Sequence, residues 1–209
     1  EVFGITPIAR IPNHDASTIL RFLDRGVQGI IVPHINTRSQ AEGVTKAARY
    51  HPEGCRGVGG GRAHDYGINT TRSESTKFVN DNILVIPMIE EVEAIKNVSE
   101  IASVEGVDVL HVAPGDLSQS MSNPPQSEVR ETMDKVVPKI RGAGKWVGVG
   151  GNSPNDVERV SDLINLGANM ITIADTLKDK PRILYLIFSY HKNIAHCNAI
   201  QTSWGANQD

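Results

Sequence analysis

Three charged residues of this sequence stand where apolar runs end, and their types suit the binding of a metal ion or an anion. Asp116 follows the run VLHVA and the bend Pro114-Gly115. Glu90 ends the run ILVIPMIE, and Arg10 ends the run ITPIAR. Two carboxylates from different strands, without a cysteine or paired histidines beside them, favour a hard cation such as Mg²⁺ or Mn²⁺ over zinc, and such an ion keeps positions open for a substrate. The alternative is that these acids cap the helices that follow, and composition alone does not separate the two interpretations.

The elements that would position these residues alternate along the chain. Short runs rich in valine and isoleucine, typical of parallel strands buried on both faces, predict strands at Ile5–Arg10, Gly29–His34, Ile83–Glu90, Val107–Ala113, Trp146–Gly151 and Met170–Asp175. Amphipathic segments predict helices at Asp15–Arg25, Thr37–Tyr50, Glu91–Ser103, Glu128–Arg141 and Pro154–Leu166. We expect a kink or an early stop at Pro138, and Ser153 as the N-cap of the last helix.

This alternation predicts an α/β fold with a parallel sheet and right-handed crossovers. The glycine-rich stretch Gly57–Arg62 follows a helix rather than a strand and lacks the spacing of a nucleotide-binding loop. A TIM (β/α)₈ barrel fits the pattern better, although we count six βα units where such a barrel has eight. We assign residues 1–190 to this partial barrel and residues 191–209 to a polar C-terminal tail.

In such a barrel the functional residues lie at the carboxyl ends of the strands. In chain order, those ends are Arg10, His34, Glu90, Asp116, Gly151 and Asp175. Glu90 stands two residues after Met88, so both side chains are expected to point into the barrel. Gly115 allows a ligand to approach the backbone closely. His111 has the parity opposite to Asp116, and we expect it to face the helix layer.

The bulk composition limits the classes of function. The chain has 209 residues, of which 39% are hydrophobic and 22% charged, as in a globular protein with a sizeable core. The formal net charge of −3, without a lysine or arginine block, argues against nucleic-acid binding. No apolar run approaches the roughly 20 residues that a membrane helix needs. Cys55 and Cys197 stand far apart, which favours reduced thiols in a cytoplasmic protein over a disulfide or a zinc site.

From Thr6 to about Leu184 the sequence resembles the HpcH/HpaI aldolase family, metal-dependent class II pyruvate aldolases that include 2-dehydro-3-deoxyglucarate aldolase. The matching stretches, in order, are PIARIPNHD, GVQGIIVP, ARYHPEGCRGV, IEEVEA, VEGVD and APGDLS. The shorter stretches RIP and VPH are similar to the macrophomate synthase branch of the family. The resemblance implies a TIM barrel and an aldolase activity.

The resemblance also implies roles for single residues. Glu90 and Asp116 match the two metal ligands, and Arg10 matches the arginine that holds the 2-oxo oxygen of the substrate and stabilises the enolate. Gly115 and Asp116 match the turn whose backbone N–H groups bind the carboxylate of the substrate. Met88 stands where the family has a glutamine. The implied cofactor is a divalent metal, Mg²⁺ first, with Mn²⁺ or Co²⁺ as alternatives.

Further implied features concern the surroundings of the site. Arg62, in the loop Arg56–Asp65, matches an arginine near the substrate, and a mobile surface loop is the alternative. Family barrels open with two βα units, the second of which carries a histidine base in an Asp-Gly-Glu-His stretch, and this sequence has neither. We therefore expect a truncated or processed chain, or other segments or subunits that cover the gap. His34 is then a substrate contact or, as the alternative, a substitute base.

The last helix of the family packs on a neighbouring subunit, and Ile183–Tyr190 matches it. We therefore expect a homo-oligomer, a trimer or a hexamer, that exchanges this helix. The small-molecule partner is a 2-oxo acid, and neither nucleic acid nor a membrane is expected as a partner.

The predicted activity is that of a lyase that cleaves a 4-hydroxy-2-oxo acid to pyruvate and an aldehyde through a metal-bound enolate. A cation would act as a Lewis acid on the oxygen that gains charge, and Arg10 would stabilise that charge in a dry site. Two alternatives stay open. One is oxaloacetate decarboxylation or macrophomate-synthase-like chemistry on the same enolate, and the other is a degenerate barrel kept for binding or assembly.

Overall fold

The structure is a computed structural model that describes residues 6–152, 156–174 and 184–188. Its strands are β1 (Ile8–Arg10), β2 (Gly29–Val32), β3 (Leu84–Ile89), β4 (Val109–Val112), β5 (Trp146–Asn152), β6 (Met170–Ala174) and β7 (Leu184–Phe188). Its helices are α1 (Ala16–Leu23), α2 (Arg38–Ala48), α3 (Arg72–Asn82), α4 (Val92–Lys96), α5 (Val98–Ala102), α6 (Pro114–Ser120), α7 (Gln126–Gly142) and α8 (Val157–Leu166), with a 3₁₀ helix η1 (Arg62–Gly67).

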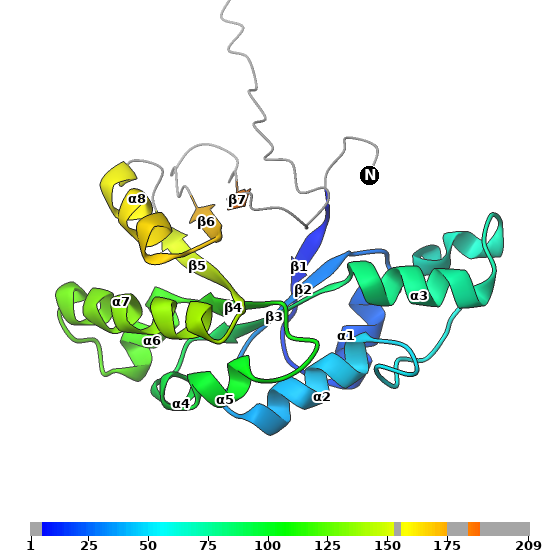
Figure 1. The fold of residues 1–209 in the computed structure, drawn as a ribbon, viewed down its shortest axis with the longest axis horizontal. Coiled ribbons are helices and arrows are strands. Elements are labelled where there is room, and N and C mark those ends of the chain that lie inside the picture. The colour runs from blue at the N-terminus through cyan, green and yellow to red at the C-terminus, as the bar shows by residue number, and fades with distance from the viewer. Residues whose placement is uncertain (1–5, 153–155, 175–183, 189–209) are drawn as a thin grey trace, which may run out of the picture.

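The strands form one sheet in chain order, from β1 to β7. Strands β1 to β6 pair in parallel, and β7 pairs antiparallel with β6. Figure 1 shows that the sheet is curled and that helices such as α1, α2 and α7 lie along its outer side. This arrangement confirms the predicted parallel α/β fold and its six strands. The curled sheet is a half-barrel, consistent with part of a (β/α)₈ barrel, and two further βα units ahead of β1 stay a prediction.

The outer, convex face of the sheet carries most of the hydrophobic core. Ile30, Leu110 and Val147, which share one parity on their strands, are each 0% exposed. They belong to the same buried cluster as Ile19 of α1 and Ile140 of α7. Full burial of each such side chain stabilises the fold by roughly 1.5–3 kcal/mol. The helices are therefore held against the sheet mainly by aliphatic packing.

The concave face of the sheet carries the strand residues of the other parity. Ile86, Val109 and Met170 form a second buried cluster there. His111 stands two residues after Val109 on β4 and therefore lies on this concave face. The prediction that His111 faces the helices is wrong. The prediction assumed that side chains alternate between the two faces of the sheet from His111 as far as Asp116. Strand β4 ends at Val112, however, and Asp116 belongs to α6, where side chains no longer alternate in this way.

Two helices of the structure differ from the predicted ones. The segment Glu91–Ser103 is divided at Asn97 into α4 and α5. We expected a kink or an early stop at Pro138. Helix α7 continues through this proline to Gly142, so the early stop is wrong, and the kink stays a prediction. Val137 and Ile140, on either side of Pro138, are buried, and this packing outweighs the hydrogen bond that proline cannot donate. No helix of the described residues has the length and apolar character needed to cross a bilayer.

Helix caps explain two further differences from the prediction. Helix α8 begins three residues later than expected, because Asp156 caps it by accepting the backbone N–H of Arg159 at 3.3 Å. Ser153, the expected cap, lies outside the described residues. Helix α3 was not predicted, since its sequence is polar and only Ser75 and Asn80 are buried. The one local signal for it is a capping box between Thr71 and Glu74.

The segment Leu184–Phe188 forms strand β7 rather than part of the predicted C-terminal helix, which is wrong for these residues. Without β7, strand β6 would present an unpaired backbone edge, and the run Leu-Tyr-Leu-Ile-Phe contains residue types that favour strands. The ends of the predicted segment Ile183–Tyr190 and the tail 191–209 lie outside the described residues. The oligomeric state and the domain limits stay predictions.

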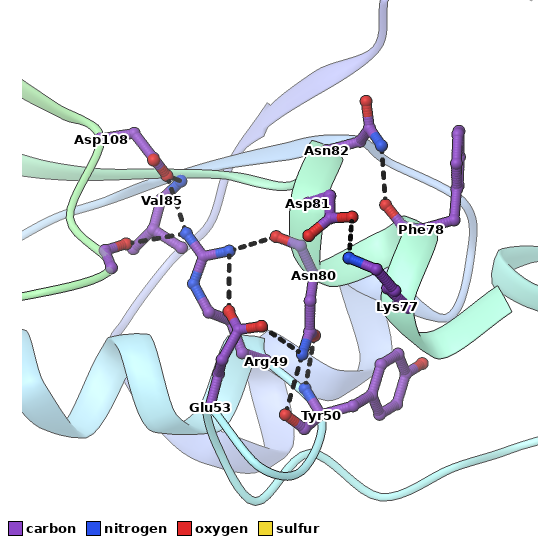
Figure 2. A network of polar contacts seen from close by, with 11 residues as sticks. Arg49, Tyr50, Glu53, Lys77, Phe78, Asn80, Asp81, Asn82, Val85 and Asp108 are labelled. Atoms are coloured by element: carbon purple, nitrogen blue, oxygen red, sulfur yellow. Dashed lines mark hydrogen bonds and ion pairs between the residues drawn. The ribbon is translucent and has the colours of Figure 1, made fainter. Parts of the chain in front are cut away.

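A buried arginine joins two βα units at the amino end of the sheet (Figure 2). Arg49 donates from Nη2 to Asp108 Oδ2 at 3.1 Å and to the Gly106 carbonyl at 3.0 Å. Its Nη1 donates to the carbonyl of Asn80, at the end of α3. Asp108 Oδ2 also accepts the backbone N–H of Val85 at 2.8 Å. This network fixes the starts of β3 and β4, and with them the places where both strands end.

Candidate active site at the carboxyl rim of the sheet

Three of the predicted site residues meet at one edge of the sheet. Arg10 is the last residue of β1, Glu90 directly follows β3, and Asp116 lies in the first turn of α6, just after β4. Because β1 to β4 run parallel, their carboxyl ends share one rim. The charges of Arg10 and Asp116 both act on the carboxyl group of Glu90. The structure therefore brings one guanidinium and two carboxylates together.

Glu90 is the buried member of this group. It is 1% exposed, whereas Arg10 and Asp116 are exposed. Burial raises the pKa of the Glu90 carboxyl and Asp116 acts in the same direction, while the backbone N–H of His34 and the charge of Arg10 oppose this shift. Among the described residues, Glu90 Oε2 is buried and has no hydrogen-bond partner. An unpaired buried carboxylate oxygen is costly, so this atom is the one that a ligand would satisfy.

His34 reaches Glu90 through a backbone conformation that is rare outside glycine. Its φ is +58°. The turn directs the His34 N–H to Glu90 Oε1 at 2.8 Å and places the ring Nδ1 2.8 Å from Glu91 Oε1 and 3.4 Å from Glu90 Oε1. A strained residue of this kind costs about 1–3 kcal/mol, which the contacts with the two glutamates offset. Because the imidazole is 61% exposed, His34 also borders the solvent side of the rim.

A second layer of side chains orients Glu91 and His34. Glu91 Oε2 accepts a hydrogen bond from Asn36 Nδ2 at 2.7 Å, and Asn97 Nδ2 donates to the Asn36 carbonyl at 2.8 Å. The hydrogen bond with His34 lowers the pKa of Glu91. Sequence reasoning missed Asn36 and Asn97. The only signal for Asn36 is its place two residues after a predicted strand end, since its partner is 55 positions away.

The donor set of Glu90 and Asp116 fits a divalent cation. One buried carboxylate oxygen lacks a partner, and a second carboxylate lies close enough to act on it electrostatically. Mg²⁺ is commonly bound by one or two carboxylates and completes its octahedron with water and substrate oxygens. The described residues contain no group of three or more His, Cys, Asp or Glu side chains that could hold a metal ion. Two carboxylates therefore favour a hard ion with open positions over a zinc site closed by protein ligands.

Gly115 and Met88 border the same rim. A Cβ atom added to Gly115 would meet nothing within 4 Å, so there is open space beside the backbone at the start of α6. The first N–H groups of a helix have no partner within it and can donate to an anion. Met88 is 5% exposed and pairs with His111 across β3 and β4, so it lies on the concave face below Glu90.

The structure does not bring Arg62 to this rim. A Cβ atom added to Gly26, which precedes β2, would lie 2.8 Å from Arg62 Cδ, so the arginine stands at the amino end of the sheet. Arg56 holds the preceding loop near the same end by donating to Asp24 Oδ1 at 2.9 Å. Asp175, at the predicted end of the sixth strand, lies outside the described residues.

Comparisons with known proteins show which family and which relatives this chain is similar to. A family model described as HpcH/HpaI aldolase/citrate lyase matches residues 3–179. A hydroxypyruvate/pyruvate aldolase of Pseudomonas aeruginosa is 35% identical over 146 residues, which cover 68% of this chain and 54% of that protein. A 4-hydroxy-2-oxo-heptane-1,7-dioate aldolase of Shigella sonnei is 36% identical over 146 residues, covering 68% of this chain and 55% of that protein. The chain thus spans about half the length of these two relatives.

This chain is also similar to a solved structure. The crystal structure of an HpcH/HpaI aldolase/citrate lyase family protein from Burkholderia cenocepacia is similar with a TM-score of 0.72 and 27% identity. The match covers 80% of this chain and 66% of that one.

Proposed function

The chain belongs to the HpcH/HpaI aldolase/citrate lyase family, and on that premise we propose that the protein is a divalent-metal-dependent carbon–carbon lyase. It cleaves a 4-hydroxy-2-oxo acid to pyruvate, or a substituted pyruvate, and an aldehyde. The observation that carries this proposal is the buried, unpartnered Oε2 of Glu90 at a rim shared with Asp116 and Arg10. The names of the relatives, which are pyruvate and 4-hydroxy-2-oxo acid aldolases, support the same class of reaction.

Glu90 and Asp116 are the proposed metal ligands, with Mg²⁺ as the first choice and Mn²⁺ or Co²⁺ as alternatives. When bound, the cation would supply a Lewis acid for the 2-oxo oxygen of the substrate. Two observations support this assignment. Glu90 is buried and its Oε2 has no hydrogen-bond partner among the described residues, and Asp116 is exposed at the solvent side of the rim.

Arg10 and the start of α6 would bind the rest of the 2-oxo acid. The guanidinium of Arg10 is proposed to donate to the 2-oxo oxygen and to stabilise the negative charge that develops there. The N–H groups of Gly115 and Asp116 would hold the carboxylate, for which the open space beside Gly115 leaves room. Water at the exposed rim would accept the proton of the 4-hydroxyl as the C3–C4 bond breaks and the aldehyde leaves, and C3 of the enolate would then take a proton from water to give the 2-oxo acid product.

Decarboxylation of oxaloacetate is a second candidate function. Loss of CO₂ forms the same enolate but does not require a base to remove a hydroxyl proton. His34 does not separate the two candidates, because the contact of its Nδ1 with Glu91 at 2.8 Å leaves Nε2 able to accept a proton. The same Arg10, Glu90 and Asp116 would serve both reactions.

Release of pyruvate, followed with a coupled dehydrogenase, tests both candidates. The purified protein is assayed with 4-hydroxy-2-oxo acids and with oxaloacetate, each with Mg²⁺ and with EDTA. The proposal predicts turnover of a hydroxy-oxo acid that EDTA abolishes and Mg²⁺ restores. Turnover of oxaloacetate alone would favour the second candidate. No metal-dependent turnover of either substrate, by a protein that still binds Mg²⁺, would leave only a binding or assembly role.

A further inference from the structure

Strand β5 is irregular where it reaches the carboxyl rim. Its pairing with β6 is regular up to Val149, and the next paired residue is Asn152. Gly150 and Gly151 therefore stand opposite the single residue Thr172 of β6, which is the arrangement of a β-bulge. Bulges bend a strand and are common beside active sites, where they change the direction of the chain.

The side chain of Asn152 closes this bulge. Asn152 is 9% exposed, and its Nδ2 donates to the carbonyl of Val149 at 3.0 Å. The same nitrogen lies 3.3 Å from the carbonyl oxygens of Gly150 and Thr172. An amide nitrogen carries two N–H donors, so one short side chain holds carbonyls of the bulge and of the neighbouring strand together.

The bulge brings Gly151 against the start of α6. The φ of Gly151 is +70°, in the left-handed region that favours glycine. A Cβ atom on this residue would lie 2.9 Å from Cγ of Pro114, the first residue of α6. The backbone of β5 therefore packs directly on the proline ring. A side chain at this position would have to displace either the bulge or the helix.

The position of Asp116 depends on how this first turn of α6 is held. Asp116 is exposed, and the N-cap residue Ala113 makes no side-chain hydrogen bond to the turn. Leu117, which is 0% exposed, anchors the turn in the core, and Pro114 packs on Gly151. Packing rather than capping therefore fixes the turn, and a shift of the bulge would move the carboxylate relative to the rest of the rim.

We propose that the β5 bulge positions Asp116 for the divalent cation, with Asn152 and Gly151 as positioning residues that act through Pro114. The inference rests on the proposed function and adds to its two ligands the part of the fold that sets how far apart they stand. Neither Asn152 nor Gly151 would contact the cation. Mg²⁺ requires near-ideal octahedral geometry, so displacement of one ligand lowers its affinity.

Binding of Mn²⁺ to the purified protein, measured by calorimetric titration, tests this role. Gly151→Ala places a methyl group against Pro114, and we expect it to weaken Mn²⁺ binding about tenfold. Asn152→Ala removes the amide that closes the bulge, and a similar loss of affinity is expected. The stoichiometry of each titration counts the folded protein, so partial unfolding is not mistaken for a change in affinity.

Gly144→Ala is the matched control. Gly144 also has a left-handed backbone, with a φ of +81°, but a Cβ atom there would meet nothing within 4 Å. This variant should therefore bind Mn²⁺ as the wild type does. Replacement of Pro114 by alanine in the Gly151→Ala protein removes the ring atoms that the new methyl group meets, and it should recover most of the lost affinity.

These variants separate the inference from the proposed function. Wild-type affinity in Gly151→Ala or in Asn152→Ala, an equal loss in Gly144→Ala, or no recovery in the double variant would overturn the inference and leave the lyase proposal standing. Absence of Mn²⁺ binding by the wild-type protein would overturn the proposed metal site and the inference with it.

Discussion

The backbone N–H of His34 donates a 2.8 Å hydrogen bond to Oε1 of Glu90, across 56 positions of sequence. This bond occupies one carboxylate oxygen and leaves the other, Oε2, buried and without a partner among the described residues. In the proposed metal site, it would therefore leave Oε2 as the oxygen of Glu90 that faces the cation. The ring of the same histidine is fixed by Glu91, which Asn36 holds in turn.

Replacement of Glu91 by alanine should weaken binding of Mn²⁺ about tenfold, measured by calorimetric titration. Glu91 does not face the cation in this proposal, but its carboxylate accepts from His34 and Asn36 and so positions the turn that holds Glu90. Glu93→Ala, two residues further on and exposed, is the control and should bind Mn²⁺ as the wild type does. Equal affinities of the two variants would show that Glu91 has no positioning role.

Replacement of Arg10 by alanine should lower kcat of the lyase reaction by about 100-fold or more, because a donor aimed at a developing oxyanion is lost. Binding of Mn²⁺ should persist, since Glu90 and Asp116 remain. Arg25→Ala, an exposed arginine after α1, is the control for the loss of a positive charge. A variant that lacks Arg10 but keeps the wild-type kcat would remove the guanidinium from the proposed reaction.

Replacement of Arg49 by alanine should lower the free energy of unfolding by about 3–5 kcal/mol, measured by urea denaturation. The change leaves the half-buried Asp108 without its ion pair and removes donors to the carbonyls of Gly106 and Asn80 (Figure 2). Arg38→Ala is the matched control, because its 2.8 Å pair with Glu42 lies on the surface, where a salt bridge contributes little to stability. Similar losses in both variants would contradict the importance of the buried network.

His111 should make stability depend on pH. The pKa of the ring is about 4 in the folded state and 6.5 without the protein environment, so between these values the unfolded chain binds a proton that the folded chain does not. Stability therefore falls as the pH drops below 6.5. Between pH 7.5 and pH 5 this single group removes about 2 kcal/mol from the free energy of unfolding.

The variant His111→Phe lacks this titration and should lose about 2 kcal/mol less than the wild type over the same interval, measured by urea denaturation at both pH values. The comparison of two proteins is needed because other groups titrate in both. Identical pH dependence of the two proteins would mean that the imidazole of His111 accepts a proton in the folded state as readily as in the unfolded chain.

The sequence predicted secondary structure and side-chain direction correctly within regular strands. All six parallel strands were predicted, because apolar runs with valine and isoleucine at nearly every position can be buried on both faces. The face of Glu90 could be counted from Met88 because β3 is regular up to Ile89. Counting failed for His111, since Asp116 lies in a helix beyond the strand and its direction does not follow a period of two.

Other features depend on contacts that no short stretch of sequence contains. Asn36 meets Glu91 only because β2 and β3 are neighbours in the folded sheet. The end of the sheet at which Arg62 lies follows from the packing of its loop against α1 and the turn at Gly26. Strand β7 pairs with the edge of β6, and composition alone could not distinguish this strand from a helix.

Deuterium exchange at C3 of pyruvate, followed by NMR without any aldehyde, tests the central claim most directly because it reports formation of the enolate alone. The wild-type protein is compared with Asp116→Ala, each with Mg²⁺ and with EDTA. We predict exchange by the wild-type protein that EDTA abolishes and added Mg²⁺ restores, and no Mg²⁺-dependent exchange by Asp116→Ala. Exchange that is equally fast in EDTA, or that survives the loss of Asp116, would contradict a metal-dependent lyase built on Glu90 and Asp116.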